Sequence, residues 1–395
     1  MNFKQKMKEF AGKNVLLLQG PIGPFFSKLA KKLKQNDARV FKLNFNGGDK
    51  FFYPFNAHKY KGELKNFKTF FKNFCKEHKI DYIITYNDCR PLHSIAIRAA
   101  KSLKIGIYIF EEGYLRPNFI TFEKNGVNAN SQLPRDKNFY IDLEVPVSVA
   151  NEKFEGAFEC MAFFAFWYWL FAFLLAPFYN NRLHHRSLSP LELIPWIRAF
   201  YRKFWYKFSE KKTNEELKKL KGKYFVAVLQ VFNDTQILKH YKGGSVEHFI
   251  IQTLSSFALN ARDKHCLVFK HHPMDRGYTH YGVLINRLCR QYKLEGRVFY
   301  IHDAHLPSLL NDALGCVVVN STVGLSALYH NCSLKVCGKA FYDIEGLSYQ
   351  KPLDIFWKEA HAFKPNYKLY TNFRSYLIQN NQINGNFYKN SFLEL

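Results

Sequence analysis

Short apolar runs alternate with amphipathic stretches of helical period in the first part of the chain. The strands that this pattern predicts are Val15–Gln19, Arg39–Leu43, Tyr82–Tyr86 and Gly106–Phe110. Helices are predicted over Phe25–Lys34 and Leu92–Ser102. Strands that alternate with helices indicate βαβ units and a parallel sheet. Ligands bind at the carboxyl ends of the strands in such a sheet, so the residues after each run are candidate site residues.

The same alternation returns after residue 220. The strands predicted there are Tyr224–Leu229, Cys266–Lys270, Arg297–Ile301 and Val317–Val319. The helices predicted there are Val246–Leu259, Pro307–Asn311 and Val323–Tyr329. A chain of 395 residues is too long for one ordinary core and suits two domains of about 150–200 residues. We therefore predict an α/β fold of two halves with a cleft between them.

A different pattern separates the two halves. Met161–Ala176 consists of 16 uncharged, almost wholly apolar residues, and Pro177 follows it. A membrane-spanning helix needs about 20 apolar residues, so this aromatic run predicts monotopic insertion into a membrane surface. With its flanks, the predicted membrane segment is Phe154–Phe178. A buried pair of core helices and an oligomer interface are the alternatives.

A basic stretch follows, with 12 Lys or Arg and four Glu between Arg182 and Lys223. Within it, Trp196–Phe208 places large apolar side chains four residues apart, the pattern of a helix that lies in a membrane interface. Arg198 and Arg202 fall on the opposite side of that helix. The basic side chains expected to attract anionic headgroups are Arg182, Arg186, Arg198, Arg202, Lys203 and Lys207.

The net charge of the chain is +25, from 57 Lys or Arg against 32 Asp or Glu. This excess indicates an anionic partner: nucleic acid, an anionic membrane or a phosphorylated substrate. The aromatic and basic residues gather in a contiguous apolar run, which favours lipid over nucleic acid. The eight cysteines include no C-x-x-C pair and are expected to be reduced, buried thiols. Walker A, G-x-G-x-x-G and H-E-x-x-H motifs do not occur, which argues against ATP hydrolysis, dinucleotide chemistry and zinc proteolysis.

Two adjacent acids are the first candidate for chemistry. Glu111-Glu112-Gly113 directly follows the predicted strand Gly106–Phe110. An acid at the carboxyl end of a strand is well placed to act as a general base. Two adjacent carboxylates cannot both point into one pocket, so we expect one to serve and the other to support it. A solvated turn is the alternative.

Three further motifs follow strands of the second half. After one strand comes His271-His272-Pro273, where an imidazole can donate a hydrogen bond to a phosphate or protonate a leaving oxygen. Asn320-Ser321-Thr322 ends a strand and begins a helix, where hydroxyl and N–H groups can bind an anion. Asp234, in Asn233-Asp234 after Tyr224–Leu229, can act as a nucleophile or general base. Ordinary capping of a helix or turn is the alternative for each of them.

These motifs occur in a defined order along the chain. They are Gln19-Gly20-Pro21, Glu111-Glu112-Gly113, Gln230 with Asn233-Asp234, His271-His272-Pro273 and Asn320-Ser321-Thr322. In this order, and over nearly its whole length, the chain resembles capsule polysaccharide biosynthesis proteins of the KpsS/LipB kind. The resemblance implies a GT-B fold, in which two Rossmann-like domains face a cleft and carry a hydrophobic, aromatic membrane-binding insertion.

The resemblance also implies a retaining glycosyltransferase. It implies transfer of the first β-Kdo residue from CMP-β-Kdo to a phosphatidylglycerol-type lipid, lyso or diacyl, which initiates the poly-Kdo linker of capsular polysaccharide. No cofactor and no metal are implied beyond the donor. The residues that it places in catalysis are Glu111, Glu112, Asp234 and His272, with Asp234 as the nucleophile. The residues that it places at the donor are Gln230, His271, Pro273, Asn320, Ser321 and Thr322.

The expected organisation has four parts. They are an N-terminal acceptor domain over 1–150, a membrane-association segment over 151–220, a C-terminal CMP-sugar donor domain over 221–350, and a tail over 351–395 that packs back on the N-terminal domain. The charged N-terminal residues are not those of a signal peptide, so we expect the protein at the cytoplasmic face of the inner membrane, bound to its anionic surface.

Other capsule biosynthesis or export proteins are expected partners, and nucleic acid is not. Two alternatives to the predicted reaction stay open. The first is a transferase that uses another CMP or CDP donor, such as sialic acid or glycerol phosphate. The second is a non-catalytic scaffold for capsule export.

Overall fold

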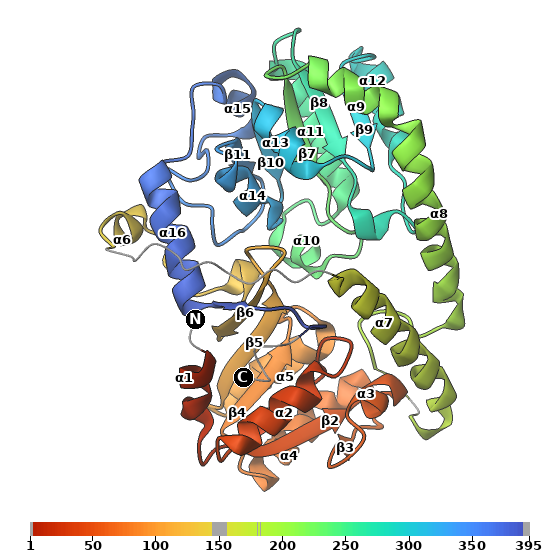
Figure 1. Cartoon of the computed structure of the whole chain (residues 1–395), viewed down its shortest axis with the longest axis vertical. Helices are drawn as coiled ribbons and strands as arrows, with labels where there is room; N and C mark the ends of the chain where they lie inside the picture. Colours follow the sequence, from red (N-terminus) through yellow and green to blue (C-terminus); the bar gives the residue numbers. More distant parts are fainter. Residues whose placement is uncertain (1–2, 144–155, 180, 182, 390–395) are drawn as a thin grey trace. The chain divides into compact units, whose positions relative to one another are not determined.

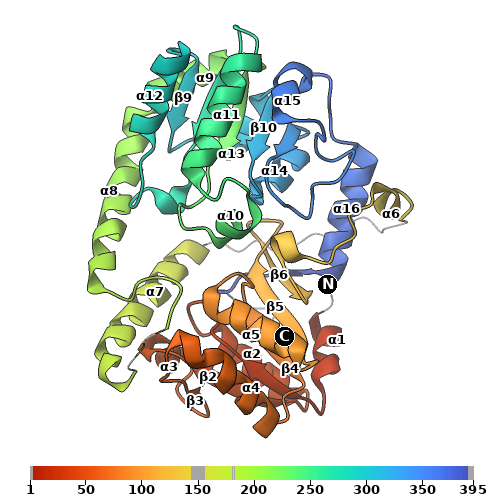
Figure 2. The same cartoon turned by 180° about the vertical axis from the view of Figure 1, so that it is seen from behind.

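The computed structural model of the chain describes residues 3–143, 156–179, 181 and 183–389. The chain forms two compact units. The first unit comprises Met1–Gln132, Val147–Glu192 and Ser375–Leu395, and the second comprises Leu133–Pro146 and Leu193–Arg374. Each unit is built on its own, largely parallel sheet with helices on its faces (Figures 1 and 2). This confirms the predicted α/β class with two sheet-centred halves.

Among the described residues, the sheet of the first unit has seven strands in the order β12-β6-β5-β4-β1-β2-β3. Their bounds are β1 Asn14–Leu17, β2 Arg39–Asn44, β3 His58–Lys59, β4 Tyr82–Tyr86, β5 Gly106–Glu112, β6 Phe119–Lys124 and β12 Gln382–Asn384. The strands from β5 to β3 pair in parallel, whereas β6 is antiparallel to β5 and β12 is antiparallel to β6. The last strand of the chain therefore completes the edge of the first sheet.

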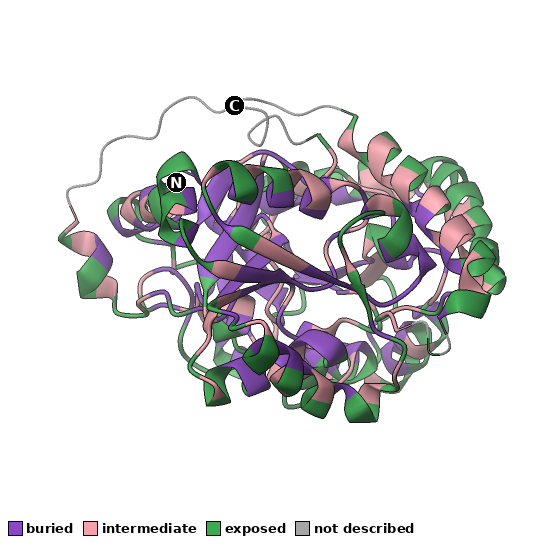
Figure 3. Cartoon of the chain, turned by 90° about the horizontal axis from the view of Figure 1, so that it is seen from below, coloured by how far each residue is buried: buried purple, intermediate pink, exposed green. Residues whose placement is uncertain are grey.

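Both faces of this sheet are buried, as its continuous apolar runs require. In β1, Val15 and Leu17 join the core on one face, whereas Leu16, together with Leu18 directly after the strand, joins the core on the other. The helices of the unit are α1 Phe3–Met7, α2 Phe25–Gln35, α3 Gly47–Phe52, α4 Phe67–Glu77, α5 Pro91–Ser102 and α7 Ala157–Leu174. The strands are largely buried, whereas the helices keep exposed outer surfaces (Figure 3).

The second unit has a five-stranded parallel sheet in the described residues, in the order β11-β10-β7-β8-β9. Its strands are β7 Tyr224–Val228, β8 Cys266–Lys270, β9 Val298–Ile301, β10 Gly315–Val318 and β11 Ser333–Val336. Its helices are α6 Lys137–Ile141, α8 Leu193–Ser209, α9 Lys211–Lys219, α10 Thr235–His240, α11 Val246–Asn260, α12 Gly282–Tyr292, α13 Leu306–Asp312, α14 Val323–Tyr329 and α15 Leu353–Glu359. Helix α16, Tyr367–Asn380, runs from the second unit into the last segment of the first.

The middle segment is divided between the two units. Helix α7 belongs to the first unit, and α8 belongs to the second. The described part of the chain has one helix long and apolar enough to cross a membrane, α7, with 18 residues. Residues 154 and 155 at the start of the predicted membrane segment lie outside the described residues, as does Arg182.

Helix α7 is fixed to the first unit along one face. Gly47 and Gly48 of α3 allow a close approach, because a Cβ at Gly47 would collide with the Phe171 carbonyl oxygen and one at Gly48 with the Tyr168 ring. The Tyr168 hydroxyl donates to Asp49 Oδ1 at 2.8 Å. This face of α7 is buried, whereas its other side keeps large apolar side chains exposed. Among these are Phe158, Phe163, Phe166, Phe173 and Leu174.

Candidate functional site

The acid pair forms the end of strand β5. Glu111 pairs with Thr121 of β6 and Glu112 pairs with Ile120, so both acids belong to the strand and not to a turn after it. Successive side chains of a strand point to opposite faces, so the two carboxylates point apart. The strand geometry therefore gives the two acids different surroundings.

Glu111 is the buried member of the pair, with 8% of its surface exposed. Asn87 Nδ2 donates to its Oε2 at 2.7 Å, and the backbone N–H of Glu112 donates to its Oε1 at 3.0 Å. Burial raises the pKa of the Glu111 carboxyl to about 7, because the charged form loses its hydration, and the nearby Glu112 charge adds to the effect. Glu111 can therefore exchange a proton near neutral pH.

Glu112 is the more exposed member of the pair. The Tyr86 hydroxyl donates to Glu112 Oε1 at 3.1 Å. The Arg90 guanidinium lies 4.6 Å from the centre of the Tyr86 ring, so a cation stands beside the acids. Of the two carboxylates, Glu112 is the one that a bound molecule can touch.

The predicted motifs of the second unit come together at one edge of its sheet. They follow β10, β7 and β8, which are adjacent strands. The loops are also joined by hydrogen bonds: Asn320 N donates to Gln230 Oε1 and Phe232 N donates to Asp275 Oδ2, each at 3.3 Å. The carboxyl edge of a parallel sheet is where ligands bind, so this cluster is the candidate donor site.

Asp234 is held from both sides in the loop after β7. Its Oδ1 accepts a hydrogen bond from Gln236 N at 2.9 Å, which caps the start of α10. Its Oδ2 accepts from Gln230 Nε2 at 2.8 Å. The capping interpretation is thus correct for one oxygen, and the Gln230 amide fixes the direction of the other.

His272 lies at the turn after β8, in front of the short helix that Pro273 begins. Its Nδ1 accepts a hydrogen bond from Met274 N at 3.2 Å. A neutral imidazole that accepts at Nδ1 carries its hydrogen on Nε2. Nε2 is therefore a donor, as an interaction with a phosphate oxygen requires.

His271 lies beneath this turn, with 1% of its surface exposed. Its Nδ1 shares a hydrogen bond with the Tyr300 hydroxyl at 2.8 Å. Burial lowers the pKa of His271 to about 3, so the ring is neutral at physiological pH. The two histidines of the motif thus occupy different environments, one inside the unit and one at its surface.

Asn320, Ser321 and Thr322 join β10 to α14. Asn320 Nδ2 donates to the Gln236 carbonyl oxygen at 3.2 Å, which ties this loop to α10. Ser321 Oγ accepts from Val323 N at 3.2 Å. Ser321 and Thr322 are both partly exposed, so their hydroxyls lie at the surface of the candidate site.

Further residues that touch this site were not expected there. Arg202 Nη1 donates to the Arg276 carbonyl oxygen at 2.7 Å, and Arg198 Nη1 donates to the Gly277 carbonyl oxygen at 3.3 Å. Both arginines of α8 thus bind the loop that carries His272, a contact that the sequence did not predict. Their four-residue spacing was the available signal, but it did not indicate which surface they contact.

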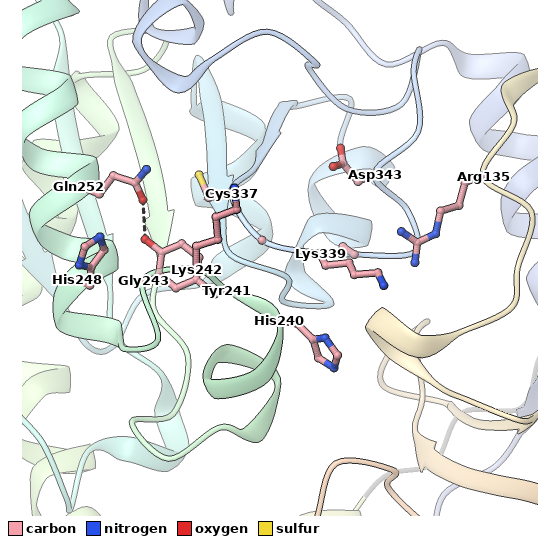
Figure 4. Close-up of a pocket in the computed structure, with 12 residues that line it drawn as sticks. Arg135, His240, Tyr241, Lys242, Gly243, His248, Gln252, Cys337, Lys339 and Asp343 are labelled. Carbon is pink, nitrogen blue, oxygen red and sulfur yellow. Dashed lines mark hydrogen bonds between the residues drawn. The ribbon is translucent and has the colours of Figure 1, made fainter. Parts of the chain in front are cut away.

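A cavity of about 540 Å³ lies in the second unit, beyond α10. Its basic lining residues, among those described, are Arg135, His240, Lys242, His248 and Lys339, against the single acid Asp343. Figure 4 shows these side chains and the hydrogen bond between Tyr241 and Gln252. Helix α10 begins next to Asp234 and ends at His240, so one helix links the candidate donor site to this cationic cavity.

In the described residues, no group of three or more His, Cys, Asp and Glu side chains could hold a metal ion. The eight cysteines are unpaired thiols, and most of them are buried. Burial raises the pKa of the Cys75 and Cys332 thiols to about 12, so these side chains stay protonated.

Taken together, the chain is a two-unit α/β protein with an acid pair in one unit and the candidate donor-site loops in the other. Residues 81–388 match the family described as capsule polysaccharide biosynthesis protein. The chain belongs to this family.

Two relatives match over nearly the full length of both chains. The capsule polysaccharide export protein KpsS of Escherichia coli is 42% identical over 381 residues, 96% of this chain and 97% of that protein. The capsule polysaccharide modification protein LipB of Neisseria meningitidis serogroup A is 39% identical over 403 residues, 99% of this chain and 95% of that protein.

Among solved structures, KpsC, beta Kdo 2,7 transferase, of Thermosulfurimonas dismutans is a more distant likeness. It shares 14% identity and a TM-score of 0.39, and the match covers 84% of this chain and 88% of that one. At this level, the likeness does not define the reaction of this chain.

Proposed function

We propose that the protein is a retaining glycosyltransferase that moves a Kdo residue from CMP-β-Kdo to a phosphatidylglycerol-type lipid. The observation that carries the proposal is the cluster of the Gln230–Asp234 pair, His272 and Asn320-Ser321-Thr322 on adjacent strands. A carboxylate of fixed direction stands there with an imidazole N–H and two hydroxyls. This set matches what a sugar phosphodiester needs: a nucleophile for the anomeric carbon and donors for the phosphate.

Two displacements would give retention of configuration. In the first, the free lone pair of an Asp234 oxygen attacks the anomeric carbon while the bond from that carbon to the CMP phosphate oxygen breaks. The His272 Nε2–H and the Ser321 hydroxyl stabilise the charge on the leaving phosphate. In the second, the acceptor hydroxyl attacks the same carbon, the Asp234 ester bond breaks, and the hydroxyl proton passes to a general base.

Glu112 is the proposed base, because it is the acid that an acceptor can touch. The Tyr86 hydroxyl holds its carboxylate in place, and the Arg90 guanidinium stacks on the Tyr86 ring. Glu111 supports it from the buried side, and its proton exchange near neutral pH sets the charge beside Glu112. His271 supports the donor loop from below through its hydrogen bond with the Tyr300 hydroxyl.

The lipid acceptor calls for a membrane surface. Phe163, Phe166 and Phe173 of α7 are each more than half exposed, and α8 exposes further aromatic side chains. Burying this area in a bilayer would contribute about 25 cal/mol per Å². The net charge of +25 adds attraction to anionic headgroups. Peripheral attachment to the cytoplasmic face of the inner membrane, together with other capsule proteins, fits these features.

The test is release of CMP by the full-length protein from CMP-Kdo in the presence of a phosphatidylglycerol lipid, with the lipid product identified by mass spectrometry. Parallel reactions with CMP-sialic acid and CDP-glycerol separate the donor alternatives. His272→Ala should lower the rate by about 100-fold or more with the fold retained. His361→Ala, an exposed histidine outside the site, is the control. Full turnover by His272→Ala at saturating donor would contradict the assignment.

A further inference from the structure

Helix α8 presents a stripe of polar side chains at strict four-residue spacing. The stripe continues past the end of α8 into α9, and its members are Arg198, Arg202, Tyr206, Glu210 and Asn214. Positions four apart are neighbours on a helix surface, and the stripe turns gradually around the helix from Arg198 to Asn214. Both helices belong to the second unit, where they lie beside β9 and α12 (Figures 1 and 2).

Every member of the polar stripe binds one of two loops. Arg198 and Arg202 donate to the Gly277 and Arg276 carbonyl oxygens, in the loop that carries His272. A Cβ at Gly277 would collide with the Pro195 carbonyl oxygen, so the helix and this loop are packed backbone to backbone.

The rest of the polar stripe binds the loop after β9. The Glu210 carboxylate accepts from His302 N, from the His302 ring at 2.6 Å and from Asp303 N. Tyr206 stacks on the His302 ring with 3.8 Å between ring centres, and Asn214 Nδ2 donates to the Asp303 carbonyl oxygen. Arg276 joins the two loops, since its Nη2 donates to Asp303 Oδ1 at 2.9 Å.

The opposite side of α8 is apolar and exposed. Its members include Ile197, Phe200, Tyr201, Phe204, Trp205 and Phe208. A surface helix of a water-soluble protein turns its apolar side to the core and its polar side to water. In helix α8 the polar stripe packs against the two loops of its own unit, and the apolar side is left at the surface. The apolar side therefore needs a cover from outside this unit.

An anionic bilayer is the cover that fits. Lys203 and Lys207 are exposed next to the aromatic side chains, where their ammonium groups can reach headgroups. Phe200 and Phe208 are 67% and 75% exposed, and aromatic rings of this kind sit well at a membrane interface.

We propose that α8 couples the lipid surface to the donor loop. When the apolar side binds an anionic bilayer, α8 keeps its polar stripe in contact with the loop after β8. The loop then keeps His272 in the position from which it can bind CMP. Arg202 is a positioning residue in this scheme, since it acts through the Arg276 carbonyl. The inference rests on the proposed function, because it takes CMP as the ligand of the His272 loop. Coupling of this kind is reciprocal, so CMP must also strengthen vesicle binding by the same factor.

The experiment measures CMP affinity of the full-length protein with and without vesicles of three parts phosphatidylcholine to one part phosphatidylglycerol. We expect the vesicles to lower the Kd for CMP on the order of five- to tenfold, and CMP to increase vesicle binding equally. Arg202→Ala should abolish both effects while it still binds vesicles. Arg202→Lys, which keeps a donor, should restore part of the coupling. Lys358→Ala on α15 removes an exposed cation elsewhere and is the matched control.

Several outcomes would overturn the proposal. One is a vesicle-bound wild type with unchanged CMP affinity. Another is full coupling in Arg202→Ala, with circular dichroism showing an intact fold. A third is a dimer that forms without vesicles and buries the apolar side of α8, because a second copy of the chain would then be the partner of that side. Absence of CMP binding under every condition would instead contradict the proposed donor site, so the two failures are distinguishable.

Discussion

Glu111 and Glu112 are neighbours in sequence, but they have different electrostatic surroundings. Because β5 alternates its side chains, Glu111 enters the unit and Glu112 faces outward. Burial stabilises the neutral form of Glu111 and raises its pKa to about 7, whereas Glu112 stays within reach of a ligand. Glu112 can thus contact the acceptor, while the protonation state of Glu111 sets the charge beside it.

Substitution of the outer acid should impair transfer more than substitution of the inner one. Glu112→Gln removes the proposed base and keeps the shape of the side chain, so we expect kcat to fall by about 100- to 10,000-fold with CMP affinity unchanged. Glu111→Gln should lower kcat less than Glu112→Gln does. The measurement is steady-state transfer to a short-chain lipid together with CMP binding. Near-normal turnover by Glu112→Gln would exclude it as the base.

Glu111 should also make stability depend on pH. Its folded pKa of about 7 lies above the ordinary value of 4.5, so the folded state binds the proton more tightly than the unfolded state. The contribution of this proton is present below pH 4.5 and is lost as the pH rises toward 7. The stability of the wild type relative to Glu111→Gln should therefore fall by about 1–3 kcal/mol between pH 4.5 and 8. Denaturant titrations measure it.

The comparison with the variant is necessary in this experiment. Burial raises the pKa of Glu123 to about 7 as well, so the wild-type profile alone mixes two carboxyls. Only the difference between wild type and Glu111→Gln isolates one of them. A difference that stays constant across this pH range would show that Glu111 is charged throughout.

At the scale of elements, the attachment of α7 depends on small residues of α3 and on one hydroxyl. Tyr168 donates to Asp49 and accepts from Asn46 Nδ2 at 2.8 Å, in a buried cluster that also includes Gln19. A polar cluster of this kind is costly to disturb, because a buried group that loses its partner keeps its desolvation penalty. The aromatic helix is therefore held by this polar cluster together with the stacking of its rings on Phe51 and Phe52 of α3.

Tyr168→Phe should destabilise the protein by about 1–3 kcal/mol, since Asp49 and Asn46 each lose a partner. Tyr201→Phe on α8 removes a hydroxyl from a side chain that is 62% exposed and should change stability little. Thermal unfolding of both variants, with limited proteolysis near residue 157 as a local readout, makes the comparison. Equal stability of the two variants would contradict the role of the Tyr168 cluster.

The sequence was informative where structure depends on local pattern. Continuous apolar runs predicted β4 and β8 with their observed bounds, because strands buried on both faces need apolar side chains throughout. The motifs after β7, β8 and β10 were also located correctly at strand ends. Their convergence follows from strand order, which only the fold supplies.

The sequence pattern could not predict features that depend on contacts with residues far away in the chain. Strand β12 was not predicted, since its three residues form a strand by pairing with β6, more than 250 positions earlier. The contact between Arg202 and the Arg276 carbonyl oxygen was not predicted for a similar reason, because the position of Arg202 on its helix does not indicate which loop it meets. Trp169, within the predicted membrane segment, donates from Nε1 to the Ser187 carbonyl oxygen at 3.1 Å, a contact that the apolar run did not indicate.

At the scale of the whole molecule, each unit carries its own exposed aromatic helix. On α7 the exposed rings include Phe163, Phe166 and Phe173, and on α8 they include Phe200 and Phe208. A membrane-bound protein would thus have two attachment points on separate bodies. Loss of one should weaken binding without abolishing it.

Phe163→Ser, Phe166→Ser and Phe173→Ser together should shift the protein from vesicles to solution. Each ring would forfeit up to about 1.5–3 kcal/mol of burial, so we expect at least a tenfold loss of vesicle binding. Activity on a long-chain lipid should fall, and activity on a short-chain soluble acceptor should persist. Flotation with liposomes is the measurement. Undiminished flotation would mean that α7 does not enter the bilayer.

Strand β12 is synthesised more than 250 residues after its partner β6, which has a consequence for folding during translation. During translation, β6 leaves the ribosome long before its outer partner exists, and its edge offers unpaired N–H and C=O groups in the meantime. At about 5–20 residues per second, the second unit takes more than ten seconds to emerge. The first unit therefore completes its sheet only after the second unit has been synthesised, and a nascent chain stalled before residue 382 would expose an open strand edge to chaperones and proteases.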